Sequence, residues 1–278
     1  MRYAIVSDIH ANSQAWDAVL LDIGSQEVDE IICLGDIVGY GPAPAAVLES
    51  VYAHCAHFVL GNHDAALCGR LDPSSFTDDA RQILDWTRSQ LDDKANGVLA
   101  AFPLVLRGTN LRCAHAEFSA PARYRYIFEP EDAPPSWEAI TEQIGFVGHS
   151  HVPGIFVVGN SGTPHVTAPQ AFVLEDEKRY IVNVGSVGQP RDGEVDACYC
   201  VFDDASREVR FRRAMFDVDA YRAELEHAGL PSRPSYFLAV AEKRTVPPVR
   251  DVLDFRPPAT SSEQATGSNL AELSVAVR

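Results

Sequence analysis

Five short clusters of metal-ligand residues constrain this chain more than any other feature, and four of them directly follow an apolar run typical of a β-strand. They are Asp8-Ile9-His10, Gly35-Asp36, Gly61-Asn62-His63-Asp64, His115 and Gly148-His149-Ser150-His151. A strand end holds side chains at fixed geometry while the loops beyond it stay open to substrate. The oxygen and imidazole donors suffice for two metal ions and leave one histidine and one aspartate over. We therefore expect a metal site with additional reactive groups beside it.

The first sixty residues alternate between strand-like and helix-like patterns. Apolar runs lie at 2–7, 31–34 and 58–60, and helical spacing of apolar residues lies at 12–25 and 43–53. This alternation predicts a parallel sheet with right-handed crossovers. Asp8, Asp36 and Asn62 then fall at the carboxyl ends of adjacent strands, where open α/β sheets place their sites.

The rest of the chain changes character. One long helix is predicted over 76–93, and nine short strand-like runs between residues 104 and 212 predict a second, partly antiparallel sheet packed on the first. Residues 118–137 lack clear periodicity and form either a lid or substrate loop or an ordinary connection. Pro-Pro pairs and a polar stretch indicate one domain at 1–244 and a flexible Pro/Ser-rich tail at 245–278.

The composition of the chain excludes some kinds of binding partner. The net charge of −16 gives no counterion-release affinity for a nucleic-acid backbone, so long nucleic acids are not expected. No run approaches the roughly 18 apolar residues of a membrane span, and the N-terminus lacks a signal peptide's apolar core. These features predict a cytoplasmic protein without a membrane partner, and they allow it to be an oligomer. The six cysteines include no C-x-x-C pair, which favours structural thiols.

The donor types indicate transition metals. Asp36 can bridge two cations through its two oxygens, and Asp8 and His10 can reach one ion together if the backbone bends just past the strand. The remaining donors are the amide oxygen of Asn62 and the imidazoles of His115, His149 and His151. Mixed ligands of this kind suit two divalent or trivalent ions of manganese, iron, zinc, nickel or cobalt, with manganese favoured in vitro. Two ions about 3.5–4 Å apart activate a bridging water or hydroxide and clamp a phosphoryl group, which predicts phosphate-ester hydrolysis.

His63 and Asp64 are the residues left over. His63 is adjacent to the ligand Asn62, so we expect its ring to project over the metal centre rather than into the core. Asp64 is expected to hold that imidazole and to favour its protonated form. The role that follows for His63 is a general acid for the leaving alkoxide, which typically contributes about 10²–10⁴ in rate.

Three further residues are candidates for binding substrate. Arg191, in the turn-rich segment 185–193, either grips a substrate phosphate or pairs with Asp192 or another carboxylate. Asn12 either orients His10 or contacts substrate, or it caps the following helix. Tyr40, in a glycine-proline turn beside Asp36, either stacks on a base or fills a gap.

Four motifs together resemble a known family. They are D-I-H-x-N at 8–12, G-D-I-V-G-Y-G-P at 35–42, G-N-H-D at 61–64 and G-S-V-G-Q-P-R-D at 185–192. Over roughly residues 1–200 the chain resembles the calcineurin-like metallophosphoesterases, in particular their small prokaryotic branch. The resemblance implies a four-layer α/β/β/α sandwich of two mixed sheets flanked by helices. Two positions depart from the pattern: Ala11 stands where glycine is common, and Glu117 follows the fourth cluster where a small residue is frequent.

The resemblance also implies a division of the ligands and a catalytic histidine. The first metal would be held by Asp8, His10, Asp36 and His151, and the second by Asp36, Asn62, His115 and His149. His63, supported by Asp64, corresponds to the catalytic histidine. The function predicted is a dinuclear metal-dependent phosphoesterase acting on small phosphomonoesters, phosphodiesters or nucleotides. A dinucleoside-polyphosphate or cyclic-nucleotide hydrolase uses the same centre, and a metal-stabilised scaffold without turnover is the alternative from another class.

Overall fold

The computed structural model describes residues 1–230, and these residues form two six-stranded sheets. The first sheet has the order β3 (His57–Phe58), β2 (Glu30–Cys33), β1 (Arg2–Val6), β11 (Ala197–Asp203), β12 (Glu208–Ala214) and β9 (Phe172–Val173). The second has the order β4 (Val105–Arg107), β5 (Leu111–Ala114), β6 (Ile144–Val147), β10 (Arg179–Asn183), β7 (Gly154–Val158) and β8 (His165–Thr167). The predicted tail at 245–278, and with it the end of the predicted domain, lies outside the described residues.

Both sheets are mixed. Strands β1, β2 and β3 run parallel, as do β5, β6 and β10, while the other pairings are antiparallel. Parallel neighbours need crossover connections, and three of these contain a helix, whereas the other helices lie between β3 and β4 or after β12. The helices are α1 (Ser13–Ile23), α2 (Pro44–His54), α3 (Asn62–Leu67), α4 (Asp78–Ser89), α5 (Asp93–Ala100), α6 (Pro134–Ala139) and α7 (Val218–His227).

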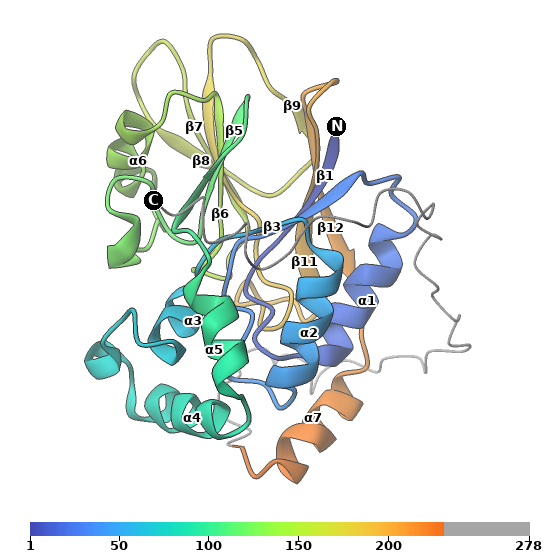
Figure 1. The fold of residues 1–278 in the computed structure, drawn as a ribbon. Helices are drawn as coiled ribbons and strands as arrows, with labels where there is room; N and C mark the ends of the chain where they lie inside the picture. The colour runs from blue at the N-terminus through green and yellow to red at the C-terminus, as the bar shows by residue number, and fades with distance from the viewer. Residues whose placement is uncertain (231–278) are drawn as a thin grey trace, which may run out of the picture.

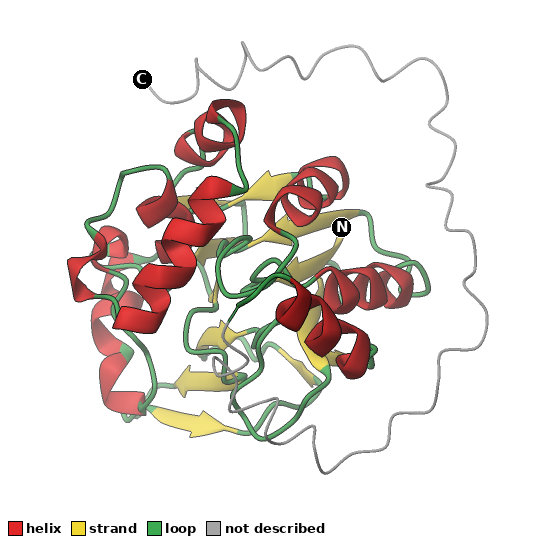
Figure 2. Ribbon diagram, turned by 90° about the horizontal axis from the view of Figure 1, so that it is seen from below, coloured by secondary structure: helices red, strands yellow, loops and turns green. Residues whose placement is uncertain are grey.

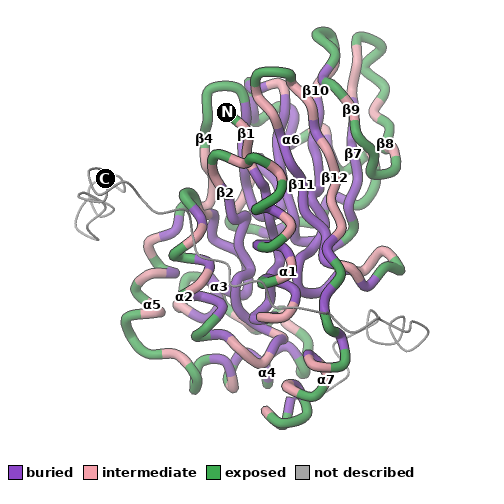
Figure 3. The backbone as a smooth tube through the Cα atoms, turned by 90° about the vertical axis from the view of Figure 1, so that its right-hand side faces the viewer, coloured by how far each residue is buried: buried purple, intermediate pink, exposed green. Residues whose placement is uncertain are grey.

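Alternation along the strands produces four layers. On β1, Ala4 and Val6 point to the helices α1 and α2, whereas Ile5 points between the sheets, where it meets side chains such as Phe146 of β6. On the outer face of the second sheet, Trp137 of α6 covers residues of β6, β7 and β10. Helices therefore flank both sheets (Figure 1), and inner strands such as β1, β10 and β11 are mostly buried, whereas the edge strands β8 and β9 are partly exposed (Figure 3). The predicted α/β/β/α sandwich is confirmed.

Two expectations concern the middle of the chain. The helix expected over 76–93 is α4, which the Thr77 side chain caps at Ala80 N and which ends at Ser89, and the Asp92 side chain caps a separate helix, α5, at Ala95 N. The segment 118–137 contains two 3₁₀ turns and the start of α6, which packs on the second sheet. In the part of the chain that the structure describes, no helix is both long and apolar enough to cross a bilayer.

Candidate metal centre

The seven predicted metal ligands converge at one end of the sandwich. Asp8 and His10 follow β1, Asp36 follows β2, Asn62 follows β3, His115 follows β5, and His149 and His151 follow β6. Since β1, β2 and β3 are parallel to one another and β5 is parallel to β6, each group of strands delivers its ligands to a common edge. Figure 2 views the molecule from this end, where the loops gather between the helices. All seven residues are buried.

The backbone bends sharply just past the strands. Five of the seven residues adopt left-handed conformations: Asp8 (φ 55°), His10 (50°), Asp36 (52°), His149 (67°) and His151 (60°). For residues other than glycine this costs about 1–2 kcal/mol each, and such strain gathers at functional sites. The bend after β1 lets both Asp8 and His10 reach the same place. Ala11 shares the conformation (φ 51°), which explains why glycine suits this position.

Close contact between two loops holds Asp36 in place. A side chain on Gly61 would put its Cβ 2.1 Å from Asp36 N and from Asp36 Oδ1, so only glycine allows this approach. The Asp36 Oδ1 atom accepts a hydrogen bond from the backbone N–H of His63 at 2.8 Å. Only its other oxygen, Oδ2, therefore remains for the centre of the site, so the expectation that each oxygen meets one cation is wrong.

The ligand atoms form two groups joined by Asp36. Donor atoms of Asp8, His10 and His151 lie within 4.8 Å of one another, as do those of Asp36, His115 and His149. Asp36 Oδ2 is 3.3 Å from His115 Nε2 in its own group and 3.8 Å from His10 Nε2 in the other. Asp36 is thus placed to touch two ions at once.

The hydrogen bonds of the imidazoles fit a metal site. The Nδ1 atoms of His10, His115 and His151 lie 3.1, 2.8 and 2.6 Å from backbone carbonyl oxygens of Val38, Leu34 and Gln189. A carbonyl oxygen can only accept, so each Nδ1 carries the hydrogen, and in a neutral ring Nε2 then bears a lone pair. This arrangement orients metal-ligating histidines in other proteins.

Acceptors then face acceptors in the middle of the site. His10 Nε2 lies 3.1 Å from His151 Nε2, and His115 Nε2 lies 3.1 Å from Asn62 Oδ1. Within residues 1–230, Asp8 Oδ1 and His149 Nε2 are buried without a hydrogen-bond partner. Buried polar atoms left unpaired are costly, and a cation would satisfy all of them. The residues present therefore fit two metal ions.

Electrostatics points the same way. Burial lowers the pKa of His115, but the carboxylates of Asp36 and Asp8 outweigh it and raise that pKa to about 10. Burial lowers the pKa of His149 to about 3. The metal-free site thus attracts a proton to His115, and a bound metal would displace it.

His63 and Asp64 are both at the site, but the expected link between them is wrong. The Asp64 carboxylate accepts hydrogen bonds from the backbone N–H groups of Ile37 (3.0 Å) and Val38 (3.2 Å), while His63 Nδ1 has no partner among the described residues. The reason is that both residues lie on α3, where successive side chains diverge by about 100°. No periodic pattern in the sequence indicates α3, so this divergence could not be predicted.

His63 is therefore positioned by rings rather than by a carboxylate. Its ring centroid lies 4.6 Å from that of Tyr40, 5.0 Å from that of Phe76 and 5.1 Å from that of His10. Burial lowers the pKa of His63 to about 4, against the expected rise. Gly39 (φ 89°) leaves room for the imidazole, because a Cβ there would lie 2.7 Å from Nδ1.

The three substrate candidates have different outcomes. Asn12 caps α1 through Ala15 N (3.0 Å) and donates to Gly188 O (3.0 Å) while fully buried, so the capping alternative holds and a substrate contact does not. Asp192 is paired with Arg213, and within the described chain no carboxylate pairs with Arg191. Tyr40 packs edge-on against His10 at 4.7 Å.

Sequence reasoning missed an aromatic pair at the site. Tyr126 stacks on the His149 imidazole, with ring centroids 4.0 Å apart and planes 14° apart. Phe128 stacks on Tyr126 at 4.9 Å and 17°. The only available signal was the cluster of aromatic and basic residues in 118–137, and periodicity could not show where it packs. The Glu117 oxygens accept hydrogen bonds from Ser119 N at 2.6 Å and Ala120 N at 2.9 Å and fix the start of this loop.

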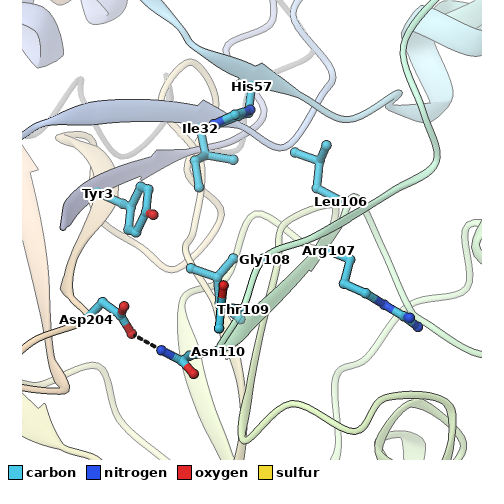
Figure 4. Close-up of a pocket in the computed structure, with 10 residues that line it drawn as sticks. Tyr3, Ile32, His57, Leu106, Arg107, Gly108, Thr109, Asn110 and Asp204 are labelled. Carbon is cyan, nitrogen blue, oxygen red and sulfur yellow. Dashed lines mark hydrogen bonds between the residues drawn. The ribbon is translucent and has the colours of Figure 1, made fainter. Parts of the chain in front are cut away.

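Cavities elsewhere have no comparable chemistry. One of about 140 Å³ lies between Tyr3 and Ile32 of the first sheet and the loop joining β4 to β5 (Figure 4). Asp204 and Asn110 at its edge are already hydrogen-bonded to each other at 2.8 Å. A second, of about 510 Å³, is lined by residues of α2 and α5, including Leu48 and Val98. Neither contains one of the ligand groups described above.

Fold and donor set together define a metallophosphoesterase. The chain belongs to the calcineurin-like phosphoesterase superfamily, whose domain model matches residues 1–207, and the predicted resemblance is confirmed. Among its relatives is an uncharacterized protein of Methanocaldococcus jannaschii, 33% identical over 222 residues, which covers 77% of this chain and 88% of that protein.

Two solved structures are also similar. The crystal structure of a metallophosphoesterase from Sphaerobacter thermophilus has 35% sequence identity and a TM-score of 0.75, and the match covers 87% of this chain and 98% of that chain. A hypothetical protein from Pyrococcus horikoshii OT3 has 19% identity and a TM-score of 0.66 over 83% of this chain and 94% of that chain. The second likeness concerns the fold alone.

Proposed function

We propose that this protein is a metal-dependent phosphoesterase that hydrolyses small phosphomonoesters or phosphodiesters. The observation that supports it most is the position of Asp36, whose Oδ2 faces both ligand groups at 3.3 and 3.8 Å. Two transition-metal ions, when bound at such a site, supply an activated water as nucleophile and stabilise negative charge on a phosphoryl group. The proposed ligands are those expected from the sequence: Asp8, His10, Asp36 and His151 for one ion, and Asp36, Asn62, His115 and His149 for the other.

The surrounding residues would orient the ester and its leaving group. Rings hold His63 beside the centre on three sides, so its imidazole has one fixed direction. We assign it the donation of a proton to the leaving oxygen; the negative charge of a bound phosphate ester would raise the pKa that burial lowers in the free protein. Arg191 lies near the hydroxyls of Tyr40 and Tyr126 and donates through Nη2 to Gln189 Oε1 at 3.0 Å. It has no carboxylate partner in residues 1–230, so its positive charge is available to a phosphate oxygen.

Asp64 enters this proposal as a positioning residue. Its bonds to Ile37 N and Val38 N fix the loop that carries Asp36, so it acts on metal binding rather than on His63. The net charge of −16 keeps long nucleic acids outside the proposed substrate range. A cytoplasmic location and manganese as the working metal in vitro remain predictions.

The test is hydrolysis by the full-length protein. After loading with Mn²⁺, it should hydrolyse p-nitrophenyl phosphate or bis-p-nitrophenyl phosphate, and a chelator should abolish this activity. A panel with diadenosine polyphosphates, cyclic nucleotides and phosphoprotein then defines the range. Protein that binds two metals but hydrolyses no member of the panel would be a scaffold, and the proposal would be wrong.

A further inference from the structure

We propose that Tyr126 and Phe128 form a stacking platform for a planar aromatic group of the substrate, so that the preferred phosphoesters are those of aryl or nucleoside alcohols. This inference rests on the proposed function, because it names the substrate class of that same site. We call the two rings the aromatic platform. No role was expected for either residue from the sequence.

The platform is a continuation of the metal centre. The Tyr126 ring lies almost flat against the imidazole of the proposed ligand His149, at 4.0 Å and 14°, and Phe128 lies almost flat against Tyr126, at 4.9 Å and 17°. Three nearly parallel rings thus lead from the ligand set to the surface. A further flat ring can join such a series at little geometric cost.

Both rings are open to solvent. Tyr126 is 46% exposed and Phe128 is 51% exposed, whereas the other described aromatic residue with a large exposed fraction, Tyr52 at 37%, lies on α2. Exposed apolar area is costly in water, so two such rings beside a polar site indicate a surface that a ligand covers.

The loop holds the platform rigidly. Tyr124 is buried, and its hydroxyl donates to Leu60 O at 3.4 Å. On the other side, the backbone N–H groups of Phe128 and Glu129 both donate to one oxygen of Asp132 at 3.0 Å. The rings between these anchors are therefore held open before any ligand arrives, which lowers the entropy cost of binding.

Charge beside the platform suits an ester of phosphate. The Arg191 guanidinium interacts with the hydroxyls of Tyr126 and Tyr40. A phosphoryl group at the ligand set can then meet Arg191 while an attached ring lies over the platform. Base–aromatic stacking contributes about 1–3 kcal/mol per base, which corresponds to roughly 5- to 150-fold in affinity.

Binding without turnover tests the platform. Calorimetry on the full-length, Mn²⁺-loaded protein compares phenylphosphonate with methylphosphonate, and the 5′-methylenephosphonate analogue of AMP with that of ribose 5-phosphate. None of the four can be hydrolysed, because a C–P bond replaces the ester bond. We expect each ring-bearing ligand, or one of the two, to bind about tenfold more tightly than its ringless match. A preference for phenylphosphonate alone identifies aryl esters, and a preference for the adenosine ligand identifies nucleotides.

Variants separate stacking from other effects. Phe128→Ala should bring the affinity ratio close to one, Phe128→Trp should keep it, and Tyr52→Ala, a stacked and exposed ring elsewhere, should leave it unchanged. Equal affinities for ringed and ringless ligands in the wild type, or an unchanged ratio in Phe128→Ala, would overturn the platform. Hydrolysis is measured in the separate assay described above. If the protein hydrolyses phosphoesters but does not prefer ligands with a ring, only this inference is wrong. If the protein prefers ligands with a ring but hydrolyses no phosphoester, only the proposed function is wrong.

Discussion

Two buried polar clusters of this protein differ in how well their atoms are paired. In the second sheet, Arg112 donates to Glu142 through Nε at 3.1 Å and through Nη2 at 3.0 Å, and Thr141 N donates to the same carboxylate at 3.1 Å. At the metal centre, bare imidazole nitrogens face one another and Asp8 Oδ1 has no donor within the described residues. A satisfied buried cluster stabilises a fold, whereas an unsatisfied one persists because something else binds there. Both clusters are buried, so it is the hydrogen bonding of their polar atoms that distinguishes the structural cluster from the functional one.

The largest effect expected at the unpaired cluster follows loss of His63. His63→Ala should lower turnover by about 10²–10⁴, because a proton donor to the leaving oxygen is removed. Metal content should stay at the wild-type value, since the ring is not a proposed ligand. Steady-state kinetics together with metal analysis measure both quantities. His57→Ala, an exposed histidine on β3 paired with Glu30, is the matched control and should change neither.

Loss of Arg112 tests the paired cluster. Arg112→Met removes both hydrogen bonds of the guanidinium and leaves the buried Glu142 carboxylate with only Thr141 N and the exposed Arg107, which should lower the free energy of unfolding by about 3 kcal/mol. Arg107→Ala should cost less than about 1 kcal/mol, because that partner lies 3.5 Å away with its side chain 69% exposed. Denaturant unfolding measures both variants. If Arg112→Met also removed metal binding from folded protein, the two clusters would not be independent and the comparison would fail.

Asp64 sharpens the comparison, because it is a paired residue within the unpaired cluster. Asp64→Ala removes the acceptor for Ile37 N and Val38 N and should weaken metal affinity by about 10–100-fold, as loss of a residue that orients a ligand does. Asp64→Asn retains one acceptor oxygen and should lose less. Metal titration by calorimetry distinguishes them. Unchanged metal affinity with lost turnover would instead show that the carboxylate acts through His63.

The smallest effect concerns pH and a half-exposed ion pair. Burial raises the pKa of Asp22, but bonds from Arg212 (2.7 and 3.0 Å) and Tyr199 (2.7 Å) outweigh it and hold the pKa below its usual value. This stabilisation is therefore present above the unfolded pKa, near 3.9, and is lost as pH falls through the folded pKa. The free energy of unfolding of the wild type should exceed that of Asp22→Asn by about 1 kcal/mol at pH 7, and this difference should shrink below about pH 4.

Unfolding at a series of pH values measures that gap. Asp219→Asn removes an exposed aspartate paired with Arg222 and serves as the control, for which little difference is expected at any pH. A gap for Asp22→Asn that grew on acidification would contradict the assigned direction of the pKa shift.

Local patterns in the sequence were sufficient to predict the sheets and the residues that gather in the two His/Asp groups. Apolar runs marked the strands, and ligands such as Asp36 and His115 directly follow them. The bond pattern of Asp64 was beyond reach, since it depends on α3, a helix of six residues with no amphipathic signal. The aromatic platform was equally hidden, because the contact of Tyr126 with His149 joins loops after different strands. Short helices and long-range loop packing leave no periodicity to detect.

Metal stoichiometry tests the central claim most directly. Full-length protein freed of metal with a chelator and then titrated with Mn²⁺ should bind two ions per chain. Asp36→Asn should lose tight binding of both, because Asp36 Oδ2 faces both ligand groups. Wild-type protein that binds no metal, or Asp36→Asn that still binds two ions with wild-type affinity, would contradict a dinuclear centre joined by Asp36.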